Sequence, residues 1–217
     1  IVTNVDHRYV VKNQLDELEL SASAILAEPE GKNTSAAVLA ACLFESQNDP
    51  ASALLVLPSD HLIKNDAMFY ESVSIGLSRL DLGNIVTFGV MPTRPEVGYG
   101  YLEIEGGATQ QAAKVNKFIE KPNLSLAEKM LQSGDYLWNA GIFLFSAKEM
   151  LRAFEQHSPD LIGPVTEAVE NSKSSNGFHY LDATSWSRCD NISLDYAVME
   201  KVGNLDAVPF LGGWNDM

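Results

Sequence analysis

Apolar and polar residues recur along the chain with two different periods, and each period predicts one kind of secondary structure. Apolar residues three or four positions apart predict helices over residues 6–20, 34–47, 66–80, 125–132, 146–157, 161–170 and 194–202. Continuous or alternating apolar runs predict strands over residues 24–27, 53–57, 85–90, 99–105, 113–119, 137–145 and 207–211. Because helices and strands alternate with short connections, the pattern predicts an α/β fold with a mostly parallel, doubly wound sheet flanked by helices.

Three segments carry more specific expectations. Residues 53–57 form a continuous apolar run ended by Pro58, which is typical of a strand buried on both faces. Residues 207–211 predict a final strand near the edge of the sheet. Residues 171–177 are rich in Ser and Asn and predict a loop.

The composition fits a single folded domain over residues 1–217. The chain is 46% hydrophobic and 20% charged, so it can bury a substantial core. No apolar run approaches the roughly 18 residues of a membrane-spanning helix, and no basic start with an apolar core marks a secretion signal. Cys42 and Cys189 lack metal-ligand spacing and fit reduced thiols of a cytoplasmic protein, with a disulfide as the alternative.

The charge of the chain limits its partners. A formal net charge of −14, with no stripe of Lys or Arg, argues against binding to nucleic acid. An anionic substrate would therefore need a few local cations, backbone N–H groups or a bound metal ion to hold it.

Two short phrases place polar side chains at the tips of apolar extended segments. They are FIEKP at residues 118–122 and WNAGIF at residues 138–143. Glu120 can accept hydrogen bonds from sugar hydroxyls, Lys121 can attract a phosphate, and Asn139 can donate and accept at once. Either phrase alone is better explained as an ordinary charged turn, but together with the further motifs below they favour a phosphorylated, polyhydroxylated small molecule as ligand.

Carboxylates follow two of the predicted strands. Asp60 closes the first apolar run, and Asp216 follows the last strand in the phrase GGWND. Ligands gather at the carboxyl ends of strands in open parallel sheets, and Mg²⁺ prefers oxygen ligands. Asp60 and Asp216 are therefore candidate Mg²⁺ ligands, with Asp60 as a plain cap of the next segment as the alternative, and the role of His61 is left open.

Another candidate region joins a short strand to a helix. Thr34 or Ser35 is expected to cap this helix, whose first N–H groups behind Gly31 can hold an anion or a base edge. Glu28 could accept hydrogen bonds from the ring N–H and amino group of a purine, and Lys32 could meet its carbonyl or a phosphate. An ordinary capped loop is an equal alternative.

A pair of glycines and a predicted helix N-terminus are the last two candidate ligand-binding features. Gly98 and Gly100 would let a ligand approach the backbone closely, although a bulge or tight turn is the better interpretation of an isolated pair. Ser193 is expected to cap the helix at residues 194–202, and a ligand role for Ser193 or Asp195 is left open.

Taken in order, these phrases resemble the successive motifs of bacterial mannose-1-phosphate guanylyltransferases. The resemblance covers essentially the whole chain, and its most specific phrases are WNAG at residues 138–141, SLDYAVME at residues 193–200 and GWND at residues 213–216. That family makes GDP-mannose and pyrophosphate from GTP and mannose 1-phosphate, with Mg²⁺, in a Rossmann-like nucleotidyltransferase fold. The resemblance implies these two substrates as partners, without nucleic acid or membrane, and leaves a homo-oligomer open.

The same resemblance implies a role for each candidate. Asp60 and Asp216 would bind the metal ion and Lys121 the sugar phosphate, which makes Asp60 and Lys121 the catalytic candidates. The residues implied to contact substrates are, on the mannose side, Gly98, Gly100, Glu120 and Asn139 and, on the nucleotide side, Glu28, Asn33 and Thr34.

The sequence departs from the family pattern in two places. Lys32 stands where the family usually has Arg, so a planar, bidentate contact is not expected there. Ile1 corresponds to a position past the family's first strand, Gly-rich loop and first helix, so little or no activity is expected of residues 1–217 alone. The alternatives are another sugar-1-phosphate nucleotidyltransferase and a non-catalytic regulatory module that binds sugar nucleotides.

Overall fold

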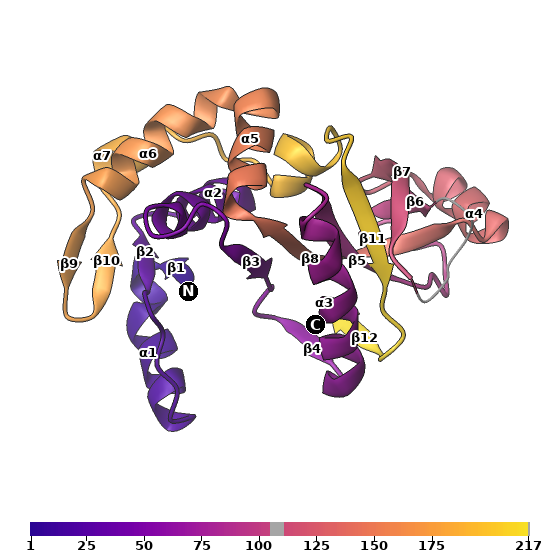
Figure 1. Cartoon of the computed structure of the whole chain (residues 1–217), viewed down its shortest axis with the longest axis horizontal. Helices are drawn as coiled ribbons and strands as arrows, with labels where there is room; N and C mark the ends of the chain where they lie inside the picture. Colours follow the sequence, from indigo (N-terminus) through magenta and orange to yellow (C-terminus); the bar gives the residue numbers. More distant parts are fainter. Residues whose placement is uncertain (105–110, 217) are drawn as a thin grey trace. The chain divides into compact units, whose positions relative to one another are not determined.

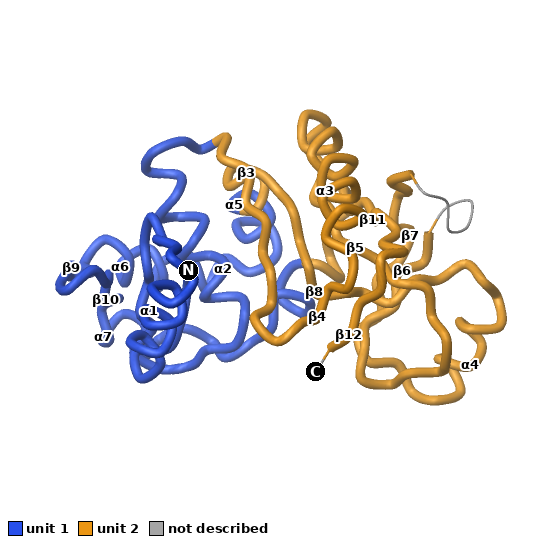
Figure 2. The backbone as a smooth tube through the Cα atoms, turned by 90° about the horizontal axis from the view of Figure 1, so that it is seen from below, with its two compact units in different colours: residues 1–50, 151–198 blue, residues 51–150, 199–217 orange. Residues whose placement is uncertain are grey.

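The computed structural model describes residues 1–104 and 111–216, and the chain forms two compact units (Figure 2). Unit 1 combines Ile1–Pro50 with Leu151–Val198, and unit 2 combines Ala51–Met150 with Met199–Met217. Both units contain strands and helices, which confirms the α/β class. That residues 1–217 act as one nucleotidyltransferase domain stays a prediction. Within the described ranges, each helix is too short or too polar to cross a lipid bilayer.

Unit 1 is built on a sheet of four described strands in the order β1-β2-β10-β9 (Figure 1). β1 and β10 run parallel to β2, and β9 runs antiparallel to β10. The strands are β1 (Val2–Asn4), β2 (Leu26–Glu28), β9 (Lys173–Ser175) and β10 (Phe178–Tyr180). The helical segments of this unit are η1 (Val5–His7), α1 (Arg8–Glu17), α2 (Asn33–Ser46), η2 (Pro159–Leu161), α6 (Ile162–Glu170) and α7 (Ala183–Trp186).

Unit 2 contains a sheet of six described strands and a two-stranded ribbon (Figure 1). The sheet has the order β3-β8-β5-β11-β7-β6, and the ribbon pairs β12 with β4. The sheet strands are β3 (Ala53–Val56), β5 (Ile85–Val90), β6 (Tyr101–Ile104), β7 (Ala113–Ile119), β8 (Tyr136–Ser146) and β11 (Leu205–Pro209). The remaining elements are β4 (His61–Ile63), α3 (Asp66–Leu80), α4 (Leu124–Ser133), α5 (Ala147–His157), η3 (Asp195–Met199) and β12 (Trp214–Asp216), with α5 and η3 crossing the sequence boundaries between the units.

The six-stranded sheet is mixed, where a mostly parallel sheet was expected. β8 runs antiparallel to both β3 and β5, and among the described strands of this sheet only β5 and β11 pair in parallel. An apolar run shows that a strand is buried but does not show the direction of its neighbours. The strands predicted over residues 99–105 and 113–119 are confirmed as β6 and β7, which pair antiparallel, although Glu105 lies outside the described residues.

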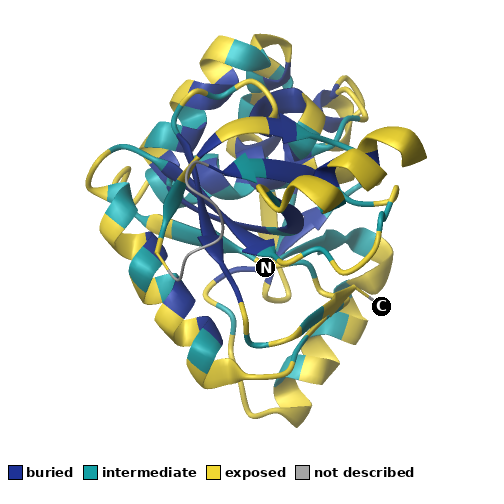
Figure 3. Cartoon of the chain, turned by 90° about the vertical axis from the view of Figure 1, so that its right-hand side faces the viewer, coloured by how far each residue is buried: buried dark blue, intermediate teal, exposed yellow. Residues whose placement is uncertain are grey.

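An apolar core packs α3 against this sheet and fixes the strands that carry the candidate residues. Gly76 allows the close approach of α3, because a Cβ there would lie 2.9 Å from Cδ2 of Leu144. β5, β8 and β11 are buried along most of their length, while the helices in Figure 3 expose their outer faces. The buried members of this core are Phe69, Val86, Phe88, Ala140, Ile142, Leu144, Val208 and Phe210. Fully burying a Val, Leu, Ile or Phe side chain contributes about 1.5–3 kcal/mol, so this packing stabilises the strands that carry the candidate residues.

Two strands occupy positions that the sequence did not predict. β3 lies at an edge of the six-stranded sheet, and its residues are exposed or half-buried, so the prediction of burial on both faces was wrong. β11 was expected near an edge, but it is buried throughout and lies between β5 and β7. Edge and centre are decided by pairing with segments far away in the sequence, which an apolar run cannot reveal.

The segment at residues 171–177, predicted as a loop, instead forms part of a hairpin. β9 pairs antiparallel with β10 across Asn176 and Gly177. These two residues have φ angles of 54° and 84°, the left-handed values that a tight hairpin turn requires. The Asn-Gly pair was therefore the signal for two strands.

The start of α2 also differs from the prediction. The helix begins at Asn33, and its N-cap residue Lys32 makes no side-chain capping bond. The hydroxyl of Thr34 instead accepts a hydrogen bond from the backbone N–H of Leu194 at 2.9 Å, so the prediction that it caps the helix was wrong. Ser193 does accept from the N–H of Tyr196 at 3.4 Å, but the helix that follows is the short π-helical turn η3.

Candidate active site

Three candidate residues meet in unit 2 where the start of β6, the end of β7 and the interior of β8 lie together. The backbone N–H of Asn139 donates to the carbonyl of Gly100 at 2.8 Å. A Cβ built on Gly100 would lie 2.6 Å from Oε2 of Glu120 and 3.3 Å from Cβ of Asn139, so the close approach requires glycine. Gly100, Glu120 and Asn139 are called the β7–β8 cluster below.

The side chain of Asn139 is held in one orientation. It is buried, and its Oδ1 accepts hydrogen bonds from Oγ1 of Thr87 at 2.8 Å and from the N–H of Gly141 at 3.2 Å. Sequence reasoning missed Thr87, which is fully buried in β5. The available signal was a hydroxyl in the middle of an otherwise apolar strand. The buried hydroxyl of Thr87 therefore fixes the orientation of the Asn139 amide, which is a candidate for binding substrate.

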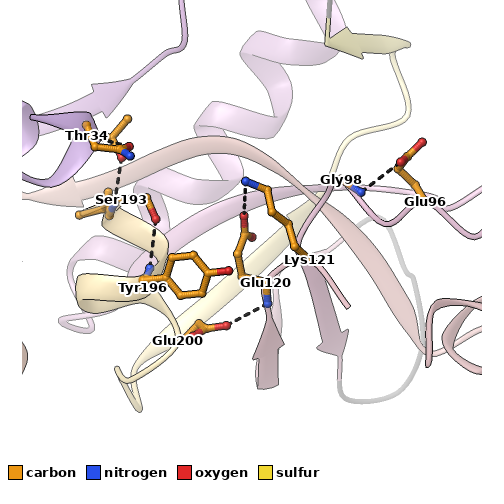
Figure 4. Close-up of polar contacts among 10 residues, drawn as sticks. Thr34, Glu96, Gly98, Glu120, Lys121, Ser193, Tyr196 and Glu200 are labelled. Carbon is orange, nitrogen blue, oxygen red and sulfur yellow. Dashed lines mark hydrogen bonds and ion pairs between the residues drawn. The ribbon is translucent and has the colours of Figure 1, made fainter. Parts of the chain in front are cut away.

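Glu120 and Lys121 form a charged turn after β7 (Figure 4). Lys121 has a φ of 48°, which is uncommon outside glycine, and its N–H donates to the carbonyl of Tyr99 at 3.2 Å. Its ammonium lies 3.6 Å from Oε1 of Glu120, and 57% of its side chain is exposed against 9% for Glu120. The N–H of Glu120 donates to Oε1 of Glu200 at 2.9 Å, which anchors the turn. An exposed ammonium on an anchored, strained turn is suited to an anionic ligand.

Gly98 makes a different contact from the one expected. Its N–H donates to Oε1 of Glu96 at 3.1 Å (Figure 4), and the N–H of Val97 donates to the same oxygen at 3.0 Å. These bonds, with the Arg94 side chain, lower the pKa of the Glu96 carboxyl. The backbone N–H of Gly98 is thus bound to the protein itself, and its contact with a sugar stays a prediction.

A second group of candidates meets at the ribbon of β4 and β12. Asp216 lies directly opposite His61 in the antiparallel register, and Asp60 immediately precedes β4. One ligand atom from each of Asp60, His61 and Asp216 lies within 4.8 Å of the others. Two carboxylates at this spacing are the oxygen donors that a hard divalent cation prefers, so the residues fit such an ion. These three residues are called the carboxylate cluster below.

The two clusters are neighbours within unit 2. A Cβ on Gly141 would lie 3.7 Å from Cε1 of His61, and the N–H of the same glycine donates to Asn139. A ligand held by the β7–β8 cluster would therefore lie close to a cation held by the carboxylates.

A row of aromatic side chains, missed by sequence reasoning, runs beside the clusters. His61 contacts Trp214, Trp214 contacts Tyr99, and Tyr99 contacts Trp138, with ring centroids 5.3, 5.3 and 5.4 Å apart. The guanidinium of Arg94 lies 5.3 Å from the ring centroid of Trp138. All of these except His61 line a pocket of about 290 Å³, near the lower limit of small-ligand sites. The described lining includes no member of either cluster, but Trp214 contacts His61 and Trp138 directly precedes Asn139 in β8, so the pocket lies beside both clusters.

In unit 1, the expected nucleotide-side residues are mostly bonded to their own unit. Oδ1 of Asn33 accepts from the N–H of Thr34 at 2.9 Å, and Thr34 accepts from Leu194 (Figure 4). The ammonium of Lys32 donates to the carbonyl of Ser187 at 3.2 Å. These contacts tie the start of α2 to distant segments of unit 1, which is a stabilising role.

Glu28 is the exception in unit 1. It is half-buried at the end of β2, and its Oε1 is a buried atom without a hydrogen-bond partner in the part of the chain that the structure describes. Burial raises the pKa of the Glu28 carboxyl to about 7 from its ordinary value of 4.5. A buried acceptor without a partner is costly unless a ligand supplies a donor.

The fold and the two clusters define an α/β protein in which paired carboxylates lie beside a polar, glycine-lined cluster. The family model for nucleotidyl transferases matches residues 1–217, so the chain belongs to the nucleotidyl transferase family. Nucleotidyltransferases of this family generally use a divalent metal.

Curated relatives and solved structures agree with this family. The chain is 41% identical over 217 residues to the xanthan biosynthesis protein XanB of Xanthomonas campestris pv. campestris (strain B100), and 35% identical over 223 residues to the mannose-1-phosphate guanylyltransferase of Escherichia coli (strain K12). Each alignment covers 100% of this chain but 46% and 47% of the relative, so the chain spans about half the length of these curated relatives.

Solved structures share the Rossmann-like fold. The mannose-6-phosphate isomerase from Helicobacter pylori matches with a TM-score of 0.90 and 28% identity, over 100% of this chain and 83% of that one. The mannose-1-phosphate geranyltransferase from Thermus thermophilus matches with a TM-score of 0.83 and 29% identity, over 99% of this chain and 59% of that one.

Proposed function

We propose that the whole protein transfers GMP from GTP to mannose 1-phosphate, which yields GDP-mannose and pyrophosphate. The family and the relatives that carry this activity in their names support the reaction class. The observation that carries the proposal is the meeting, within one unit, of the carboxylate cluster and the β7–β8 cluster. A sugar phosphate and a cation would then be bound side by side.

The sugar is recognised by the β7–β8 cluster in this proposal. Glu120 accepts hydrogen bonds from hydroxyls of mannose, and Asn139 meets the sugar with an amide that Thr87 holds in place. Gly100 would meet the sugar through its backbone, and its lack of a side chain lets the Glu120 carboxylate lie close, since a Cβ there would collide with Oε2 of Glu120. Lys121 places its ammonium at the sugar phosphate and offsets part of its negative charge.

The reaction needs no covalent intermediate with the protein. A phosphate oxygen of mannose 1-phosphate attacks the α-phosphorus of GTP, the bond from that phosphorus to the bridging oxygen breaks, and pyrophosphate leaves with the electron pair. Asp60 and Asp216 would hold a Mg²⁺ ion, which supplies neutralisation of the phosphate charges when bound. The protein contributes position and charge, which matter here because a chain of net charge −14 must bind two anions.

The guanine base is assigned to Glu28. A carboxylate with an unpartnered buried oxygen can accept hydrogen bonds from the ring N–H and the amino group of guanine at once. Asn33 and Thr34, whose oxygens accept bonds from the backbone, shape the loop around the base.

The test is a substrate panel with the full-length protein. We expect GTP, Mg²⁺ and mannose 1-phosphate to give GDP-mannose faster than any other hexose 1-phosphate gives its own product. Faster use of glucose 1-phosphate or N-acetylglucosamine 1-phosphate would identify another sugar-1-phosphate nucleotidyltransferase. Binding of GDP-mannose without turnover of any sugar phosphate would identify a non-catalytic regulatory module.

A further inference from the structure

Trp214 determines which nitrogen of His61 carries the proton. Nε1 of the indole lies 3.2 Å from Nδ1 of His61, and the rings meet edge to face at an interplanar angle of 89°. An indole N–H can only donate, so Nδ1 must accept. A neutral imidazole has one proton, which therefore lies on Nε2.

The protonated nitrogen is the one that faces the carboxylates. Nε2 of His61 lies 4.0 Å from Oδ1 of Asp60 and 3.8 Å from Oδ1 of Asp216. The ribbon explains this placement, because Trp214 and Asp216 are two residues apart on β12 and therefore on the same face of the strand. One strand thus contacts both nitrogens of His61.

This arrangement is the reverse of the one that metal-binding histidines show. A ligating histidine coordinates through a lone pair and donates its other ring N–H to a carboxylate or carbonyl. Here Nδ1 of His61 accepts a hydrogen bond from Trp214, and Nε2, which faces the proposed cation, carries the hydrogen.

We infer that His61 is a positioning residue which presents an N–H to the carboxylates of Asp60 and Asp216, and that Trp214 keeps His61 out of the coordination of the metal ion. The inference rests on the proposed cation site of Asp60 and Asp216. Without a nitrogen ligand the site offers oxygen atoms, which suit Mg²⁺, and it disfavours Zn²⁺, which imidazole would attract. Trp214 therefore determines which metal ion the site selects.

The first experiment measures the tautomer in the metal-free full-length protein. Nitrogen-15 NMR of labelled histidine at about pH 8, where an ordinary imidazole is neutral, distinguishes the protonated from the unprotonated ring nitrogen. The signals of His61 are those lost in His61→Asn. We expect hydrogen on Nε2 and a lone pair on Nδ1; a lone pair on Nε2 would overturn the inference without any reference to catalysis.

The second experiment measures Zn²⁺ and Mg²⁺ affinity by calorimetry in folded variants. Trp214→Phe keeps a ring beside His61 but removes the donor, so we expect Zn²⁺ to bind about tenfold more tightly, the scale on which outer-shell partners act, with Mg²⁺ little changed. Adding His61→Asn to this variant should abolish the gain. The matched control is Trp138→Phe, because the indole N–H of Trp138 has no partner among the described residues.

The possible failures separate the two proposals. Unchanged Zn²⁺ affinity in Trp214→Phe would overturn the role of Trp214 in metal selection. A wild-type protein that binds no Mg²⁺ would instead contradict the cation site of the proposed function, while the tautomer measured without metal would stand.

Discussion

The two units hold their candidate residues in different ways. In unit 2, side chains from segments far apart in the sequence lie close together. Hydrogen bonds from neighbouring side chains hold them in place, as the Thr87 hydroxyl holds Asn139. In unit 1, Asn33 and Thr34 accept bonds from backbone N–H groups, and Glu28 keeps a buried oxygen without a described partner. The comparison teaches that polar residues at a helix start are often used by the fold itself. Recognition in unit 1 should therefore depend mainly on Glu28.

The largest effect is expected at the carboxylate cluster. Asp60→Asn keeps the shape of the side chain but removes the charge that would hold the cation, so turnover by the full-length protein should fall about a hundredfold or more, the scale of losing one preorganised electrostatic contact. Steady-state kinetics with a Mg²⁺ titration would measure the loss. Asp81→Asn, an exposed aspartate at the end of α3, is the control and should leave turnover unchanged. Near-normal turnover with unchanged Mg²⁺ dependence would show that Asp60 only caps β4.

The next effect separates the sugar from the nucleotide. Glu120→Gln removes a charged acceptor, and a hydrogen bond to a charged group contributes about 1.5–3 kcal/mol, so kcat/KM for mannose 1-phosphate should fall roughly tenfold to a hundredfold. The KM for GTP should stay nearly constant, because the proposal assigns Glu120 to mannose hydroxyls and the guanine base to Glu28. Glu103→Gln on β6 is the matched control. A lower melting temperature with unaffected kinetics would show that Glu120 stabilises the fold and does not bind the sugar.

Sequence patterns predicted the elements whose signals are local. The bounds of α3 and β5 match the predicted ranges, because a helical period of apolar residues and a continuous apolar run are both read from neighbouring residues. The FIEKP and WNAGIF phrases also pointed to Glu120 and Asn139, which the structure brings together with Gly100. Short motifs can therefore identify the members of a cluster before their geometry is known.

The sequence could not predict features that depend on distant partners. The N–H that Thr34 accepts belongs to Leu194, which is 160 positions away. The edge position of β3 likewise follows from pairing with β8 alone among the described strands. The role of Trp214 was missed because its contact with His61, 153 positions away, cannot be predicted from the sequence around either residue.

A smaller effect should follow from loosening the support of Asn139. Thr87→Val preserves the shape of the side chain and removes the hydroxyl that donates to Oδ1 at 2.8 Å. A neutral hydrogen bond contributes about 1 kcal/mol, so the KM for mannose 1-phosphate should rise roughly fivefold, with GTP binding unaffected. Ser78→Ala removes an exposed helical hydroxyl and serves as the control. If sugar binding does not change, Asn139 is oriented without Thr87.

The smallest effect concerns stability and tests Glu28. Burial raises the pKa of this carboxyl to about 7 in the folded protein, against an ordinary value of 4.5. Between these values, the unfolded chain loses a proton that the folded protein keeps, so this residue lowers the free energy of unfolding as the pH rises, and its full penalty is present above about pH 7. Glu28→Gln cannot ionise, so this variant should be more stable than the wild type at about pH 8 and should lose that advantage toward about pH 4.5.

The same substitution should weaken GTP binding, which separates a ligand role from a structural one. If the ionised carboxylate accepts the two donors of guanine, the GTP affinity of the wild type rises as the pH passes through about 7, and Glu28→Gln binds more weakly with little pH dependence. Denaturant unfolding and calorimetry at matched pH values would measure both quantities. Glu30→Gln, an exposed neighbour in the same loop, is the control. A variant that gains stability at high pH yet binds GTP as the wild type does would show that the unpartnered carboxylate belongs to the fold, and that unit 1 recognises the base through other atoms.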